Sequence, residues 1–535
     1  MSTMIIPRPN PLVLLGEVYV WPARLGVELL DLIIAAVRRR REHVLAQSPA
    51  WLIAEQEIAT NVQNLKTPIA FGLLLLLILS STFFMANDYD QRLINWSINR
   101  IAQADELFSG TTAFYQTLGR DFMMMRARSV RPEPIIRRPL PLSILAKGLD
   151  AEMERAVTLG GPDRLGPIIT FHLGNPQEVV RTKRLFAPPD FLYVVKIILS
   201  LLALFFTFDI ITREKETGTL ASTLANPVPR RSLLLGRWLG ATASLQTTFL
   251  LATGLGLLYL TSVRGLTLSG IDWQRVGLLI GASMLYGSVF VTLGMFLSAW
   301  ATRTKAAAGL ALAAWLVLVL ILPNLTALAA QRLKLLPTPA EHERALLRAA
   351  REIEDEAEAK HLSGFAVPGY GRLHKEVSPR VRAVARQLDD TYINRRLERD
   401  RLARQLARLS PVSSFVYVAT DLAGTGTAEF EAYIEKLRRA RNQYIELADR
   451  RDTEISLRLS SQEPPEQQQA RLQAALQEFF AKTKRLQQQL HESLIEPRSP
   501  RQAIRDALPD LALLFGWNAL LLLGAALQFN RYDVR

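Results

Sequence analysis

The sequence predicts an α-helical polytopic membrane protein with six transmembrane helices, N-terminal interfacial helices and two large extracytoplasmic insertions. The chain of 535 residues is 49% hydrophobic and 21% charged, and its apolar residues are gathered in blocks rather than spread evenly. Six of these blocks approach the length that crosses a hydrocarbon layer, about 20 mostly apolar residues. Two long polar stretches, residues 86–190 and 331–510, separate some of the blocks and are the expected insertions.

The N-terminal region, residues 1–67, is predicted to lie at the cytoplasmic membrane surface. The stretch from Leu12 to Val37 is apolar but carries four charged residues, too many for a comfortable span. It ends at four consecutive arginines, which suit an anionic inner leaflet. It lacks the basic start, unbroken apolar core and cleavage pattern of a signal peptide. The stretch from Trp51 to Lys66 is expected to form a second surface helix that leads into the first span.

The expected spans are residues 68–85, 191–211, 239–263, 277–300, 306–330 and 511–529. Only the second contains charged residues, Lys196 and Asp209, and each lies near one of its ends. Lysine and arginine in short flanks mark the cytoplasmic side of a membrane protein. They place both termini, the segment 212–238 and the tail 530–535 in the cytoplasm, so that both insertions lie outside.

The two insertions differ in their sequence patterns. In residues 86–190, closely spaced prolines precede a helix-like stretch, and "PIITFHL" alternates as a strand does, so we expect a mixed α/β domain. In residues 331–510, apolar residues recur every three or four positions, as at Leu346, Ala350 and Ile353, which predicts an all-helical domain of long antiparallel helices. Ser378 followed by Pro379 predicts a helix start, and "EPPE" at residues 463–466 predicts a break.

One stretch of the second insertion, Leu409 to Phe430, is apolar enough to touch the membrane. A seventh span here would invert the last span and place Arg531 and Arg535 outside. We therefore expect this stretch to lie at the outer membrane interface.

Several kinds of chemistry are excluded by the sequence. The absence of cysteine excludes disulfides and thiolate sites, and no phosphate-binding G-x-x-x-x-G-K-[ST] loop occurs. The six histidines are scattered without a metal-binding pair, and no catalytic constellation is found, so we expect no metal, cofactor or catalytic site in this chain. The net charge of +14 is spread along the chain, partly beside apolar blocks. This pattern favours membrane lipids as partners over nucleic acid.

The most informative stretch follows the second span and reads "FDIITREKETGTLASTLANPVPRRSLLLGRWLG". The acids Asp209, Glu214 and Glu216 form a charged collar. The stretch from Gly218 to Asn226 reads as a short helix with Leu220 and Leu224 four residues apart, and it ends before two prolines. A short helix held between two membrane helices is stiff and could transmit a push from a soluble partner.

This stretch resembles the first cytoplasmic loop of type-2 exporter permeases of the ATP-binding cassette (ABC) superfamily. The resemblance rests on an acidic pair, a Gly-Thr-Leu step and a proline-arginine turn, with the matching residues Asp209, Glu214, Glu216, Gly218, Thr219, Leu220, Asn226, Pro227 and Arg230. In that family the short helix docks in a cleft of the ATPase subunit. Together with Leu224 and Arg231, these are the candidate ATPase-coupling residues.

The resemblance implies a permease subunit of an exporter in the bacterial inner membrane. Its partners would be a cytoplasmic ABC ATPase dimer, which binds ATP and Mg, and a second copy or a related permease; the chain itself would not be an enzyme. The stretches "PLSILAKGLD" and "SPVSSFVYVATDLAGTG" resemble a subgroup with large periplasmic insertions, similar to permeases near nitrous-oxide-reductase maturation and gliding-motility systems.

Two alternatives stay open at this point. The chain could transmit mechanical work to a periplasmic partner without translocating a substrate, which the long helices of the second insertion favour. It could instead be a membrane scaffold without an ATPase, which would leave the coupling-like loop unexplained.

Overall fold

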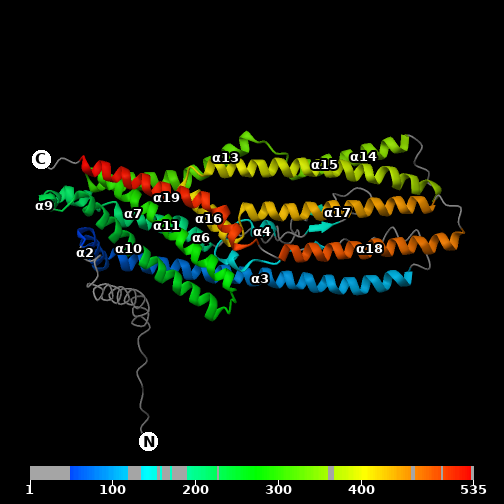
Figure 1. Cartoon of the computed structure of the whole chain (residues 1–535), viewed down its shortest axis with the longest axis horizontal. Helices are drawn as coiled ribbons and strands as arrows, with labels where there is room; N and C mark the ends of the chain where they lie inside the picture. Colours follow the sequence, from blue (N-terminus) through cyan, green and yellow to red (C-terminus); the bar gives the residue numbers. More distant parts are fainter. Residues whose placement is uncertain are drawn as a thin grey trace, which may run out of the picture.

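The computed structural model describes residues 48–117, 134–135, 137–153, 157–159, 169–171, 189–225, 228–359, 367–459, 464–495 and 498–531. The expected interfacial helix at residues 12–37 and the four arginines after it lie outside these residues. Helices dominate the described part and run roughly along one axis, with a membrane bundle at one end and a long helical projection at the other (Figure 1).

Six helical segments of the described part are long and apolar enough to cross a membrane, which confirms the six expected spans. Spans 1 to 6 are Lys66–Ile98, Phe191–Thr217, Arg230–Val263, Gly270–Trp300, Thr304–Leu333 and Pro500–Asn530. Span 4 is central, with 67% of its most apolar window buried, against 22% for spans 5 and 6. The last two spans therefore leave most of their surface free for lipid or another chain.

Three spans contain a π-helical turn. Span 2 consists of α6 (Phe191–Tyr193), the π turn η4 (Val194–Leu199), α7 (Ser200–Thr207) and α8 (Thr212–Thr217). Span 3 consists of α10 (Arg230–Leu258) and η5 (Tyr259–Val263), and span 5 of α12 (Thr304–Trp315), η6 (Leu316–Ile321) and α13 (Leu322–Leu333). Span 4 is the single helix α11 (Gly270–Trp300), and span 6 is α19 (Pro500–Asn530).

The helix before span 1 packs tightly against span 3. This helix, α2 (Pro49–Gln63), was expected at the membrane surface. A β-carbon at Gly240 of α10 would lie 2.5 Å from Cβ of Glu57, and one at Gly236 would lie 2.6 Å from the carbonyl oxygen of Ala50. Glycine at these two positions lets the backbones approach closely, as small residues do between membrane helices.

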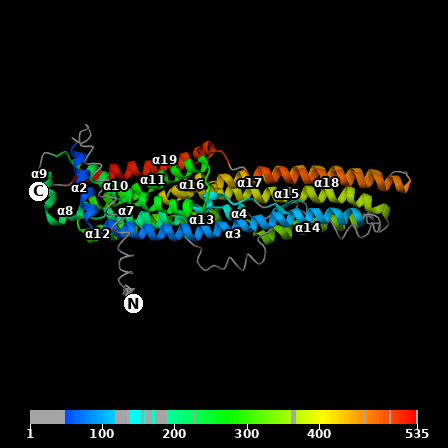
Figure 2. The same cartoon turned by 90° about the horizontal axis from the view of Figure 1, so that it is seen from below.

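The helix of span 1 continues far beyond residue 85. It is the first part of α3 (Lys66–Thr117), which runs from the membrane bundle along the helical projection (Figure 2). The expected domain boundary at residue 86 is therefore not a helix end. Hydropathy marks where the apolar residues stop, but the backbone hydrogen bonds of a helix continue wherever other helices support it.

The rest of the first insertion contributes short elements. They are β1 (Pro134–Ile135), the 3-10 turn η3 (Pro141–Ile144), α4 (Asp150–Met153), β2 (Val157–Leu159) and β3 (Ile169–Phe171). The strands form an antiparallel sheet in the order β1-β2-β3, with Ile135 opposite Val157 and Thr158 opposite Thr170. A strand lies in "PIITFHL" as expected. Strands of two and three residues do not support a mixed α/β domain, which stays a prediction.

The described part of the second insertion is all-helical, as expected. Its long helices α14 (Pro339–Ala359), α15 (Val367–Ala407), α17 (Thr427–Leu459) and α18 (Pro465–Ile495) form the stalk. The break near "EPPE" is confirmed, since α17 ends before it and α18 begins within it. The expected helix start at Ser378 is wrong, because Pro379 lies inside α15. Packing against α14, α13 and α17 holds this helix together although the proline removes one backbone hydrogen bond.

The stretch expected at the outer membrane interface is largely buried among other helices. It forms α16 (Pro411–Ala423), which packs between α11 and α19. The fully buried Phe415 stacks on Tyr286 of span 4, with ring centroids 4.5 Å apart. Thirteen residues are too few to cross the membrane. The stretch is therefore not a seventh span but a short helix packed against the bundle, and its position at the outer interface stays a prediction.

The two stretches that suggested the subgroup meet beside this helix. The Thr425 hydroxyl donates to the Ala146 carbonyl oxygen (2.8 Å), and the Leu149 N–H donates to the Thr425 carbonyl oxygen (2.7 Å). Gly148 adopts a φ of +47°, and a β-carbon there would lie 2.5 Å from the same carbonyl oxygen. The first and second insertions are thus joined at the base of the stalk.

Candidate functional site

The charged turn, defined as residues 209–231, lies at the end of the molecule opposite the stalk (Figure 1). It contains α8, then Gly218, then the short helix α9 (Thr219–Ala225). Gly218 adopts a φ of +74°, a left-handed conformation that L residues with a β-carbon avoid. This conformation ends α8 and redirects the chain into α9. Asn226 and Pro227, two of the candidate residues, lie outside the described residues.

Asp209 joins the C-terminal part of span 2 to the start of span 1. Both of its carboxylate oxygens accept hydrogen bonds from Nζ of Lys66, at 3.0 Å each. The same ammonium lies 5.4 Å from the ring centroids of Phe205 and Phe208, where a cation is attracted to the aromatic faces. Lys66 was not singled out from the sequence, although it stands at the edge of the first apolar block.

Glu214 joins the charged turn to span 3. Its Oε1 lies 2.5 Å from Nη2 of Arg237, while Nη1 of the same guanidinium donates to the Ile210 carbonyl oxygen at 3.0 Å. Arg237 is only 6% exposed, so the ion pair is shielded from water on one side. Leaving such a charge without its partner is costly, and the pair therefore holds α8 and α10 together.

Glu216 and Lys215 join the turn to spans 4 and 5. Oε1 of Glu216 accepts from the Thr304 N–H (3.0 Å) and Oε2 accepts from the Thr304 hydroxyl (2.6 Å), so Glu216 caps the start of α12. Nζ of Lys215 donates to the carbonyl oxygens of Ala299 (2.6 Å) and Ala301 (3.1 Å) at the end of α11.

The two leucines of α9 face the protein interior. Leu220 is 1% exposed and packs in a cluster with Leu233 of span 3, Met295 of span 4 and Phe529 of span 6. Leu224 packs partly against the same cluster. Leu220 therefore packs against its own chain, and its role in ATPase coupling stays a prediction. A leucine stripe on a short helix buries itself against whatever apolar surface is nearest, and here that surface belongs to the same chain.

The opposite face of α9 is exposed. Thr219, Ala221 and Ala225 lie on it, and the Thr219 hydroxyl is 2.8 Å from the Thr217 hydroxyl. At the end of the turn, Nη1 of Arg230 donates to the Asn530 carbonyl oxygen of span 6 at 3.0 Å, while Arg231 is exposed. The outward face of α9 is thus made of small side chains, and Arg231 is exposed at the start of α10.

The helix α2 adds one more carboxyl group to this site. Burial raises the pKa of Glu57, Arg237 opposes this effect, and the nearby Glu214 and Asp209 raise the pKa further. Sequence reasoning missed both Glu57 and Arg237. The signal that could have found them is the pair Gly236 and Gly240 beside Arg237, since small residues four apart indicate a close helix contact.

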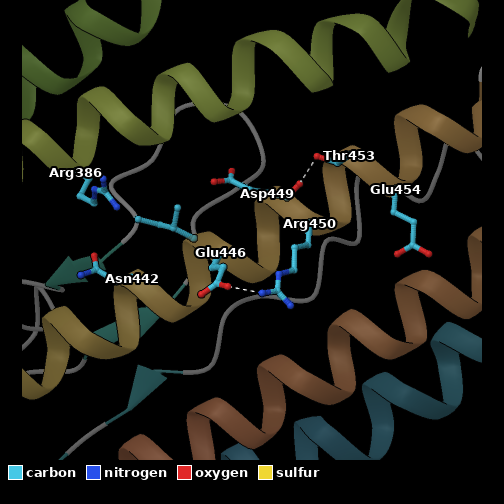
Figure 3. Close-up of a pocket in the computed structure, with 8 residues that line it drawn as sticks. Arg386, Asn442, Glu446, Asp449, Arg450, Thr453 and Glu454 are labelled. Carbon is cyan, nitrogen blue, oxygen red and sulfur yellow. Dashed lines mark hydrogen bonds and ion pairs between the residues drawn. The ribbon is translucent and has the colours of Figure 1, made fainter.

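A cavity lies elsewhere, in the stalk (Figure 3). It measures about 680 Å³ and is lined by α15 and α17, with Arg386, Glu446, Asp449 and Arg450 among its residues. Two of its carboxylates form ion pairs nearby: Glu446 with Arg450, and Asp449 with Arg382 (2.6 Å). Within the described residues no group of three or more acidic or histidine side chains could hold a metal ion.

Comparison with known proteins identifies a family for most of the chain. A family model described as ABC-2 family transporter protein matches residues 51–534. The probable ABC transporter permease protein NosY of Pseudomonas aeruginosa is 35% identical over 124 residues, which make up 23% of this chain and 45% of that protein. The protein of the same name from Stutzerimonas stutzeri is 34% identical over 125 residues, with the same shares. The matched stretch covers less than half the length of these curated relatives.

Proposed function

Because this chain belongs to the ABC-2 family of transporter proteins and is an integral membrane permease, we propose that it couples ATP hydrolysis by a separate cytoplasmic ATPase dimer to export of a substrate. Permeases of this family typically lack a nucleotide-binding domain, so the partner would bind ATP and Mg. The chain would lie in the bacterial inner membrane, with both termini in the cytoplasm and the stalk in the periplasm.

The observation that carries the proposal is the set of hydrogen bonds and apolar contacts that join the charged turn to the spans around it. Its side chains are bonded to spans 1, 3 and 5 through Lys66, Arg237 and Thr304. Leu220 packs on span 6 as well. A displacement of α9 is therefore passed to several membrane helices at once, as a rigid-body movement requires.

The proposed docking surface is the exposed face of α9, with Thr219, Ala221 and Ala225. The other candidate residues serve this face indirectly. Gly218 sets the direction of α9, Leu220 and Leu224 fix its inner side, and the three acids tie it to the spans. Small side chains allow the backbone of α9 to enter a cleft closely.

A second permease, either a copy of this chain or a related subunit, is the proposed partner within the membrane. Spans 5 and 6 leave most of their apolar windows exposed, which leaves room for such a contact as well as for lipid. The substrate pathway would then lie between the two permeases. ATP-driven closure of the ATPase dimer would switch this pathway between inward and outward access.

The proposal is tested by copurification of the permease with its ATPase after detergent extraction. Ala221→Arg and Ala225→Arg place a long charged side chain on the docking face and should abolish the association. The matched control is Ala481→Arg, which changes an alanine that is also exposed, on α18 of the stalk. If the ATPase stays bound to all three variants, α9 is not the docking element.

A second candidate function, mechanical work on a periplasmic partner without translocation, is favoured by the length of the stalk. The helix α15 has 41 residues, which span about 60 Å at 1.5 Å per residue. Uptake of candidate substrates into inverted membrane vesicles separates the two functions. An exporter accumulates its substrate in an ATP-dependent way, whereas a purely mechanical subunit accumulates none.

A further inference from the structure

We propose that span 6 is a strut that transmits movement of the charged turn to the stalk, with Asp510 as the positioning residue at its outer end. The inference rests on the proposed function, because it needs an ATPase that moves α9. It goes beyond that function by naming the helix and the side chains through which the work reaches the other side of the membrane.

The inner end of span 6 is held by the charged turn. Phe529 and Ala525 of α19 are buried in the cluster that contains Leu220. The carbonyl oxygen of Asn530, at the end of the same helix, accepts a hydrogen bond from Arg230 at 3.0 Å. A displacement of α9 is thus transmitted to the end of α19 through both apolar packing and a hydrogen bond.

The outer end of span 6 is held by the stalk. Asp510 of α19 is fully buried, and its oxygens accept hydrogen bonds from Arg404 of α15 and from Arg408, which follows the last residue of that helix. Oδ2 accepts from Nη2 of Arg404 (2.9 Å), and Oδ1 accepts from Nε of Arg408 (2.8 Å). Oδ2 also accepts from Nη2 of Arg408 at 3.1 Å. Charged hydrogen bonds of this kind are short and directional.

Arg404 extends this joint to two further helices. Its Nη2 also donates to Oδ2 of Asp421 in α16 (2.5 Å), and its Nη1 donates to the Thr427 hydroxyl at the start of α17 (2.8 Å). One guanidinium thus joins α15, α16, α17 and α19. Movement of Asp510 would therefore displace the base of the stalk rather than one helix of it.

The helix between the two ends is suited to carry a displacement. From Asp510 to Phe529 it is uninterrupted, and its rise of 1.5 Å per residue gives a length of about 28 Å, close to the thickness of the hydrocarbon core. Pro509 lies just beyond the outer end. Proline removes a backbone hydrogen bond and permits bending, so α19 can pivot at the joint without losing its stiffness within the membrane.

Span 4 supports the strut at its middle. Oδ1 of Asn518 in α19 accepts from the Thr292 hydroxyl (2.7 Å), and Nδ2 of Asn518 donates to the Ser288 hydroxyl (2.7 Å). The inner end of span 4 is itself bonded to the charged turn, since the Ser298 hydroxyl oxygen accepts from the Thr212 N–H at 3.1 Å. The two helices are therefore expected to move together.

The experiment measures the distance between the stalk and the membrane bundle in the permease bound to its ATPase in lipid nanodiscs. The chain contains no cysteine, so Thr267→Cys and Gln443→Cys, both exposed, place two spin labels uniquely. Distances are recorded by pulsed electron spin resonance without nucleotide and after trapping with ATP and vanadate. The labelled parent should show a shift of the distance distribution on trapping.

Asp510→Asn should abolish this shift while vanadate trapping still occurs. The matched control is Asp506→Asn, one turn earlier in α19, whose carboxylate is bonded to Arg498 rather than to the stalk. The control should keep the shift of the parent. If Asp510→Asn does not reach the membrane, Arg408→Gln is measured instead, which keeps the Arg404 contact and should reduce the shift.

A shift of parental size in the Asp510→Asn variant, or in Arg408→Gln where that variant replaces it, would overturn the inference. A parent that traps nucleotide without any shift would overturn it as well and would leave the proposed function intact. If the permease neither binds an ATPase nor alters its vanadate trapping, the proposed function fails first, and the strut has nothing to transmit.

Discussion

Glu216 caps the helix of span 5 by accepting hydrogen bonds from both the N–H and the hydroxyl of Thr304. The two earlier acids of the same turn behave alike, since Asp209 binds Lys66 and Glu214 binds Arg237. Each acid thus reaches a different span. The charged collar therefore attaches the turn to three spans. Under the proposed function, these contacts are how a helix as short as α9 would act on a large membrane bundle.

Gly218→Ala is predicted to impair coupling through backbone strain alone. A β-carbon at this position would meet no atom within 4 Å, but the left-handed conformation disfavours it by roughly 1–2 kcal/mol. We expect α9 to shift and ATPase stimulation by the permease to fall. Gly265→Ala is the matched control, because Gly265 has a φ of +65° and equally open surroundings in the loop after span 3. Equal loss of stimulation in both variants would contradict this assignment.

Leu220 is predicted to act through stability rather than through direct docking. Leu220→Ala should lower the free energy of unfolding by about 2–5 kcal/mol, as in other buried leucine truncations. Leu220→Met keeps the volume, should cost less than about 1.5 kcal/mol and should retain the ATPase. Thermal unfolding and copurification of both variants give the answer. A well-folded Leu220→Met variant that loses the ATPase would show that the leucine contacts the partner after all.

Glu57→Gln is predicted to stabilise the protein at neutral and alkaline pH. The folded state raises the pKa of Glu57 above its ordinary value of 4.5, chiefly through burial. Between the ordinary and the raised pKa only the folded state holds the proton, so this carboxyl lowers stability as pH rises through that window. Glutamine cannot ionise and therefore removes this loss of stability. The melting temperature should therefore exceed that of the parent at pH 8, and the difference should vanish as pH falls below the window.

Glu341→Gln provides a comparison in which the expected change of melting temperature has the opposite sign. Hydrogen bonds from Thr338 lower the pKa of Glu341, so its ionised form contributes stability that is lost as pH falls through the lowered value. This variant should melt below the parent at pH 8, with the difference again vanishing in acid. The account of the site is wrong if Glu57→Gln, like Glu341→Gln, lowers the melting temperature at pH 8.

The ion pair between Glu214 and Arg237 is predicted to matter more than exposed pairs. Glu214→Gln weakens a charge-assisted hydrogen bond to a buried guanidinium, and a cost of about 1–3 kcal/mol is expected. Glu446→Gln changes a pair in which both side chains are mostly exposed, and such pairs contribute at most about 1 kcal/mol. Thermal melts of the two variants under one condition test the difference. A larger loss in Glu446→Gln would contradict the structural ranking.

The spans and the stalk helices could be predicted from sequence because both depend on local pattern. An apolar block of sufficient length, or a stripe such as Leu346 and Ile353, specifies a helix before its partner is known. The positions at which these helices begin and end were harder to predict from the sequence. Pro379 lies inside a helix, and α3 continues past the apolar block, because tertiary packing supports backbone that local pattern would end.

The candidate site was only half predictable for a different reason. The acids and Gly218 stand out in the sequence, but their partners Lys66, Arg237 and Thr304 come from distant positions that no spacing connects. Leu220 and Leu224 were recognised as a stripe, yet the pattern does not say whether a stripe faces its own chain or a partner. That choice depends on the ends of spans 3, 4 and 6, which the fold brings together beneath α9.

The most direct test of the central claim is accessibility of a single cysteine on the exposed face of α9. Ala221→Cys in the cysteine-free chain is treated with a maleimide, with and without the ATPase bound, and Ala481→Cys on the stalk serves as the control. The account predicts rapid labelling of the free permease at both positions, and protection by the ATPase at residue 221 alone. Equal labelling of residue 221 in the free permease and in the complex would contradict it.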